Sequence, residues 1–120
     1  MINGTSPSII TLLKQTDEQV VIPSNKNISL NLNGQTFYNT SENSAITNNG
    51  KLEISGMGVI DSTGTIISNK SNAILQAYEA TLKIESLDKI AIVNENLGSV
   101  TLGDIQLQTK VHQIRQLNRI

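Results

Sequence analysis

The 120-residue chain contains no cysteine and no tryptophan, and aromatic residues make up only 2% of it. Without cysteine, the protein has neither disulfide bonds nor thiolate metal sites. No apolar run approaches the roughly 20 residues of a membrane-spanning helix, and no basic segment followed by an apolar run indicates a signal peptide in this chain. The charges are mixed, with a formal net charge of −1, and form no basic stripe of the kind that binds nucleic acid.

The abundant residues are instead isoleucine, leucine, asparagine, serine and threonine. Branched aliphatic side chains suit the half-buried face of a strand, and small polar residues suit turns and outer faces. The length is enough for one domain with a modest core. The composition therefore predicts a single β-rich domain with no membrane span and no nucleic-acid partner.

A short phrase recurs along the chain: an apolar residue, a variable residue and a second apolar residue, followed by turn-forming residues. Such alternation predicts a strand with one buried face. Strands that recur in this way predict a solenoid, in which each coil buries its apolar face against the next coil. The four copies, 24, 30 and 18 residues apart, are Ile28-Ser29-Leu30, Leu52-Glu53-Ile54, Leu82-Lys83-Ile84 and Val100-Thr101-Leu102.

Two further apolar patches lie between these copies and give three short strands for each coil. One is an Ala-Ile phrase, at Ala45-Ile46, Ala73-Ile74 and Ala91-Ile92; the other lies at Phe37-Tyr38, Val59-Ile60 and Ile105-Gln106-Leu107, with Leu87 in the shortest repeat. Because parallel coils place like residues above one another, Asn49 and Asn94 are predicted to form an amide ladder. Glu53 and Lys83 are predicted to be outward-facing neighbours on adjacent coils.

The corner between the third patch and the Ala-Ile phrase is predicted to vary in length. It would hold residues 39–44 in one coil, 61–72 in the next and 88–89 in the last full coil. Insertions in a repeat protein map to loops on one face, which is often the binding face. An alternative is that Thr65-Ile66-Ile67, inside the longest insertion, forms an extra strand.

The two ends of the chain differ from the repeats between them. Residues 1–19 are predicted to be an N-terminal cap, 20–109 the β-helix coils, and 110–120 a C-terminal cap or tail. In the N-terminal cap, Ser6 would be the N-cap and Pro7 the first residue of a short helix; its apolar face would hold Ile9, Leu12 and Leu13. In the tail, an apolar residue recurs every three positions, which also suits a subunit contact; these are Val111, Ile114, Leu117 and Ile120.

Two stretches, VIPSNKNISLNLNGQTF and AITNNGKLEISGMGVID, resemble the parallel β-helix modules of bacterial surface proteins in the pectate-lyase-like group. The resemblance covers roughly residues 20–107. It implies a right-handed single-stranded parallel β-helix of about four or five coils, in an extracellular or cell-surface setting and often within a longer adhesin-like chain. Phage tail proteins use similar solenoids, commonly as trimers. The residues that carry the resemblance are Ile22-Pro23, Leu32-Asn33-Gly34, Ala45-Ile46, Asn49-Gly50 and Leu52-Glu53-Ile54.

An enzyme that resembles the β-helix lyases or hydrolases would need clustered carboxylates, either as calcium ligands or as the acid and base of glycoside cleavage. The aspartates Asp17, Asp61 and Asp88 are isolated in the sequence, as is Asp104. The only histidine, His112, has no nucleophile or acidic partner at a recognisable spacing. We therefore predict no catalytic residue, no metal site and no cofactor. The alternative is that stacking gathers Glu53, Asp61 and Glu85 into a polysaccharide-cleaving site.

The function that we expect is that of a non-enzymatic β-solenoid module of a bacterial cell-surface or secreted protein. It would serve as a scaffold or as an adhesion and recognition module, with a carbohydrate or a host-surface molecule as ligand. One alternative is a fragment of a polysaccharide lyase or glycoside hydrolase. Another is a phage tail or spike segment that forms homo-oligomers through the C-terminal tail. The predicted ligand-binding residues are Tyr38, Asn39, Glu42, Asn43 and Asp61.

Overall fold

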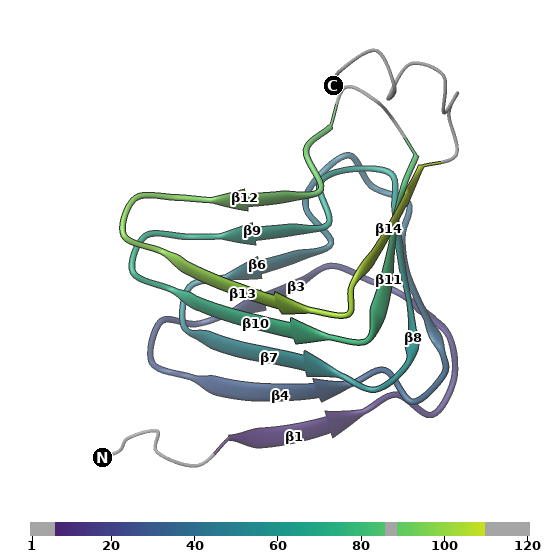
Figure 1. Cartoon of the computed structure of the whole chain (residues 1–120), viewed down its shortest axis with the longest axis horizontal. Coiled ribbons are helices and arrows are strands. Elements are labelled where there is room, and N and C mark those ends of the chain that lie inside the picture. Colours follow the sequence, from purple (N-terminus) through teal and green to yellow (C-terminus); the bar gives the residue numbers. More distant parts are fainter. Residues whose placement is uncertain (1–6, 86–88, 110–120) are drawn as a thin grey trace.

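The computed structural model describes residues 7–85 and 89–109, which form fourteen strands and no helix (Figure 1). The strands make three parallel sheets. Sheet A contains β1 (Ser8–Thr11), β4 (Asn27–Asn31), β7 (Lys51–Ser55), β10 (Ile74–Tyr78) and β13 (Ser99–Gly103). Sheet B contains β2 (Thr16–Asp17), β5 (Thr36–Asn39), β8 (Gly58–Ser62), β11 (Ala80–Ile84) and β14 (Gln106–Thr109). Sheet C contains β3 (Val20–Ile22), β6 (Ile46–Asn48), β9 (Ile67–Asn69) and β12 (Ile92–Asn94).

The chain visits sheets A, B and C in turn, and each strand pairs in parallel with the strand three positions further along. One visit to all three sheets is one coil, and the coils stack from β1 upward in Figure 1. The described residues make about four such turns. The predicted all-β parallel β-helix is thereby confirmed. The described residues contain no helix long and apolar enough to cross a membrane.

The repeat is more regular than the sequence pattern predicted. On sheet A the inward-facing residues Ile28, Leu52, Leu75 and Val100 stand in one column, at steps of 24, 23 and 25 residues. The third copy of the phrase was therefore placed wrongly. Leu82-Lys83-Ile84 is part of β11 in sheet B, where Leu82 lies beside Ile60. Every strand of a β-helix buries alternate residues, so the alternation identifies a strand but not the sheet to which it belongs.

This correction changes the predicted neighbours. Glu53 lies beside Gln76 on sheet A, not beside Lys83. Lys83 lies beside Asp61 on sheet B. Phe37, Ile60 and Leu107 do share one column, as the third patch predicted, and Leu82 is its missing member. Leu87, which was suggested for that place, lies outside the described residues.

Sheet C uses Ile46, Ile67 and Ile92 in one inward-facing column. Ala45-Ile46 and Ala91-Ile92 were therefore assigned to the correct sheet. The assignment of Ala73-Ile74 was wrong, because Ile74 begins β10 of sheet A. Ile67 begins β9, an ordinary strand of the repeat rather than an extra one. Residues 61–72 are consequently not an insertion.

The predicted amide ladder exists, but its members are Asn48, Asn69 and Asn94. Asn48 Nδ2 donates to Asn69 Oδ1 at 2.8 Å, and Asn69 Nδ2 donates to Asn94 Oδ1 at 2.9 Å. The amides also bind backbone carbonyls of the corner that leads from sheet C to sheet A, including that of Ala73. Asn49 is not in the ladder, because it follows the inward-facing position of β6 by one residue.

The N-terminal segment is not a helical cap. Residues 8–11 form β1, which pairs in parallel with β4. Ile9 and Leu13, which the helix would have buried on one face, are 74% and 82% exposed. Strand pairing satisfies the open edge of β4, which a helix would leave without partners, and two β-branched isoleucines favour the extended backbone. Ser6 and the predicted C-terminal cap or tail, 110–120, lie outside the described residues.

Candidate functional site

The corner between sheets B and C, here called the loop corner, is the one at which coil length varies most. It holds residues 18–19, 40–45, 63–66 and 85–91 in successive coils, and 86–88 are outside the described residues. The prediction of a variable corner was right about its place and its first loop. It was wrong about the lengths, because the second loop is short and the third is long.

Asn39, at the end of β5, holds the loop 40–45 in place from its buried side. Its side chain is buried, and its Nδ2 donates to the carbonyl of Asn43 at 2.7 Å and to Ser62 Oγ at 3.0 Å. The amide of Ser41 donates to Asn39 Oδ1 at 3.1 Å, and the Ser41 hydroxyl accepts from the amide of Asn43 at 2.8 Å. These hydrogen bonds hold the backbone of the loop in place.

The loop 40–45 lies directly on the coil that follows it. At Gly64 in that coil, an added Cβ would collide with the carbonyl oxygens of Glu42 and Asn43. Only glycine permits this close approach. Beyond Gly64 the loop reaches the fourth coil, where Lys89 Nζ lies 3.6 Å from Glu42 Oε1. The Glu42 side chain is 82% exposed, so this ion pair contributes little to stability.

The outward face of sheet B runs alongside this loop. Tyr38, Asp61 and Lys83 stand in one row across β5, β8 and β11. Asp17 precedes them on β2 and accepts a hydrogen bond from Thr40 Oγ1 at 3.1 Å, which ties the loop to the row. Asp61 is buried although its strand position faces outward.

The structure therefore gathers the predicted binding residues on one side of the molecule, but gives them different positions. Tyr38 is partly exposed in the row, and Glu42 and Asn43 are exposed on the loop. Asn39 points inward, and its side-chain amide bonds to the loop 40–45 and to Ser62. Its role is therefore to position the loop, and its side chain is not part of the exposed surface. Lys83 and Lys89 also lie in this region, but they were not among the residues predicted from the sequence. Placing Leu82 in the column of Ile60 would have revealed Lys83 beside Asp61.

The carboxylates of the enzyme alternative do not share a sheet position. Glu53 lies on β7 of sheet A, Asp61 on β8 of sheet B, and Glu85 in the corner that follows β11. Across residues 7–85 and 89–109, no three His, Cys, Asp or Glu residues gather as metal ligands would.

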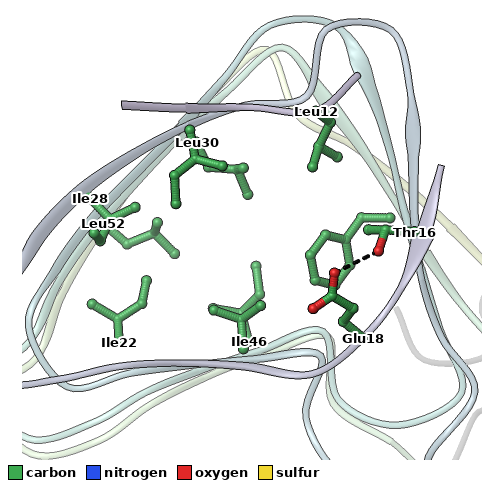
Figure 2. Close-up of a pocket in the computed structure, with 11 residues that line it drawn as sticks. Leu12, Thr16, Glu18, Ile22, Ile28, Leu30, Ile46 and Leu52 are labelled. Atoms are coloured by element: carbon green, nitrogen blue, oxygen red, sulfur yellow. Dashed lines mark hydrogen bonds between the residues drawn. The ribbon is translucent and has the colours of Figure 1, made fainter. Parts of the chain in front are cut away.

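A cavity of about 200 Å³ lies inside the first coils, at the N-terminal end (Figure 2). Its lining is apolar except for Thr16 and Glu18, and the Thr16 hydroxyl donates to Glu18 Oε2 at 2.7 Å. Figure 2 shows both of these side chains directed into the interior, opposite Ile28 and Leu52. The cavity is thus a continuation of the apolar core of the solenoid. Its lining is a second candidate site for binding an apolar group.

Comparison of the chain with protein-family models, curated proteins and solved structures found no match, so function is inferred from the fold and the surface geometry.

Proposed function

We propose that the chain is a non-enzymatic β-solenoid module of a cell-surface or secreted protein, and that it recognises a carbohydrate through Tyr38, Glu42 and Asn43. The observation that carries the proposal is the loop 40–45. A buried asparagine fixes its backbone, while its exposed side chains carry a carboxylate and an amide beside a tyrosine.

These three side chains supply the chemistry that a sugar needs. The Asn43 amide offers both donors and an acceptor to hydroxyl groups, and the Glu42 carboxylate accepts hydrogen bonds. The Tyr38 ring presents an apolar face with a polar hydroxyl at its edge. A loop that is already ordered loses little conformational entropy when a ligand binds, which raises affinity for a given set of contacts.

The body of the solenoid suits the role of a scaffold. Coils of nearly constant length stack with their apolar columns and their asparagine ladder in register, so a loop on one coil keeps a fixed place relative to the next. Binding residues are often placed on loops that a rigid scaffold positions. The resemblance to pectate-lyase-like surface modules supports the extracellular setting of this proposal.

A glycan array on the purified chain, with and without calcium, tests the proposal. We expect binding confined to one class of polysaccharide, and a loss of about tenfold or more in Tyr38→Ala or Asn43→Ala, which corresponds to about 1.4 kcal/mol. Tyr78→Ala is the matched control. That tyrosine lies on sheet A, where its ring packs on the backbone of Gly103, and its loss should leave sugar binding unchanged.

Two results would contradict the proposal. Absence of binding to any glycan would remove the recognition role and leave only the scaffold. Equal losses in Tyr38→Ala and Tyr78→Ala would place the ligand elsewhere or show that both variants are damaged in their fold. A β-type circular dichroism spectrum for each variant separates these explanations.

A further inference from the structure

Asp17 lies directly beside the surface proposed to bind sugar. β2 and β5 pair in parallel, and Asp17 is the register partner of Tyr38. Side chains alternate along a strand, so Thr16 faces the core, where it lines the cavity, and Asp17 faces outward and is exposed. Aligned residues on neighbouring strands stand about 4.8 Å apart. The Asp17 carboxylate and the Tyr38 ring are therefore within reach of the same ligand.

Two hydrogen bonds from Thr40 hold the Asp17 carboxylate against the loop 40–45. The Thr40 hydroxyl donates to Asp17 Oδ2 at 3.1 Å, and the Thr40 amide donates to Asp17 Oδ1 at 3.4 Å. A carboxylate has about four acceptor positions, so about two remain for a ligand, one on each oxygen. The side chain is thus held in place with acceptor capacity to spare.

We propose that Asp17 is a further binding residue of this surface and that it selects a neutral sugar with two adjacent free hydroxyl groups. The inference rests on the proposed recognition function and names the class of its ligand. The sugar ring would lie on the face of Tyr38, and each of the two hydroxyls would donate to one oxygen of the Asp17 carboxylate. Adjacent hydroxyls on a sugar ring are close enough for this arrangement, and hydrogen bonds to an ionised acceptor are the stronger kind.

The charges around Asp17 disfavour an acidic sugar. Two other carboxylates of the region have a lysine next to them: Asp61 lies beside Lys83 on sheet B, and Glu42 Oε1 lies 3.6 Å from Lys89 Nζ. Among the residues that the structure describes, Asp17 takes part in no ion pair. A uronate carboxylate placed near Asp17 would therefore meet a like charge, which repels it. An ionised carboxylate also offers no donor to an anionic group.

A glycan array followed by titration calorimetry tests the inference. We expect the parent chain to bind a neutral polysaccharide on the array. The matched probe for calorimetry is the same polymer after oxidation of its primary hydroxyl groups to carboxylates, which leaves the ring hydroxyls in place. We expect this oxidised polymer to bind about tenfold more weakly or worse, because its carboxylates are repelled by Asp17.

Asp17→Asn makes the test specific to this side chain. Asparagine keeps an oxygen that can accept from Thr40, but it replaces the second acceptor with a donor and removes the charge. We expect the variant to bind the neutral polymer about tenfold more weakly and the oxidised polymer more tightly than the parent does, so that the preference between the two polymers is lost. A residue that only positioned the loop would change both affinities in the same direction.

Glu53→Gln is the matched control. It removes an outward-facing carboxylate of sheet A and changes the net charge of the chain by the same amount as Asp17→Asn does. We expect it to alter neither affinity. Hydrogen exchange of the amides in 40–45 checks that the loop stays ordered in Asp17→Asn.

The outcomes separate this inference from the proposed function. Binding of uronate polymers in preference to neutral ones would overturn the inference and leave carbohydrate recognition standing. The same conclusion would follow from a neutral ligand whose affinity is unchanged in Asp17→Asn, or from equal losses in Asp17→Asn and Glu53→Gln. Absence of binding to any glycan would overturn both the inference and the recognition function.

Discussion

Two corners of the solenoid use asparagine in different ways. At the ends of β6, β9 and β12, which we call the ladder corner, Asn48, Asn69 and Asn94 bond to one another from coil to coil. At the loop corner, Asn39 bonds within its own coil and to Ser62 of the next, and it fixes a loop. The first arrangement requires the coils that it joins to be alike, whereas the second permits the coils to differ. The ladder corner thus stabilises the stack of coils, while the loop corner of the same coils can vary in length and sequence.

The largest expected effect comes from breaking the ladder at its central member. Asn69 is fully buried and bonds to Asn48, Asn94 and the carbonyls of Ala73 and Ser99. Asn69→Ala leaves buried polar groups without partners on both neighbouring coils. We expect the free energy of unfolding to fall by about 3 kcal/mol, measured by urea denaturation.

Asn49→Ala is the control for that measurement. Asn49 lies one residue beyond the ladder and should change the free energy of unfolding by about 0.5 kcal/mol or less. Equal effects of Asn69→Ala and Asn49→Ala would show that the ladder does not stabilise the corner.

A smaller effect is expected from releasing the loop. Asn39→Ala removes the bonds to Asn43 and Ser62 and should lower the free energy of unfolding by about 1–2 kcal/mol, since exposed backbone groups of the loop can bond to water instead. Hydrogen exchange of the amides in 40–45 should accelerate, whereas those in β6 should not. Equal acceleration in both segments would mean that Asn39 supports the whole coil.

Gly64→Ala disturbs the loop from the opposite side. The new methyl group collides with the carbonyls of Glu42 and Asn43, so the loop must lift from the third coil. We expect a loss of about 1–2 kcal/mol in unfolding free energy, together with weaker glycan binding. Gly34→Ala is the comparison, because its surroundings are open; its cost would come only from the positive φ of 75°.

The smallest effects should come from two ion pairs between described residues, one at each corner. Lys70 Nζ lies 3.0 Å from Glu95 Oε2 beside the ladder, and Lys89 Nζ lies 3.6 Å from Glu42 on the loop. Double-mutant cycles should give a coupling of about 0.5 kcal/mol for the first pair and less for the second, and added salt should reduce both. A larger coupling energy for Lys89 and Glu42 than for Lys70 and Glu95 would contradict the view that the ladder corner contributes more to stability than the loop corner.

The strands were predictable because their alternation is local. Phe37, Ile60 and Leu107 were assigned to one column from the pattern alone, and the structure places them there. The register between coils was harder to predict. The copy in β10 carries Ala77 where other coils carry a larger residue, so Leu82 in β11 fitted the pattern better. That error paired Glu53 with Lys83, although their neighbours are Gln76 and Asp61. It also made residues 61–72 look like an insertion, although they include the regular strand β9.

Two features depend on contacts that no single segment contains. The spacing of Ile9, Leu12 and Leu13 suits a helix, but the open edge of β4 selects a strand. The Asn-Asn pair at 48 and 49 offers two candidates for the ladder, and only the register of β6 with β9 decides between them. The variable, polar corner between sheets B and C was predictable because loop length and polar composition can be read directly from the sequence. The inward orientation of Asn39 was not predictable in this way.

The asparagine ladder also has a consequence for how the length of such a protein can change. Inserting a single residue before Asn69 in β9 would turn its amide out of the ladder, so the ladder resists changes of one residue. Adding or removing a whole coil preserves every rung and alters the height of the molecule by about 4.8 Å. The solenoid therefore has a discrete set of permitted lengths, and descendants of this sequence should differ by multiples of roughly two dozen residues in the body while their loop corners vary freely.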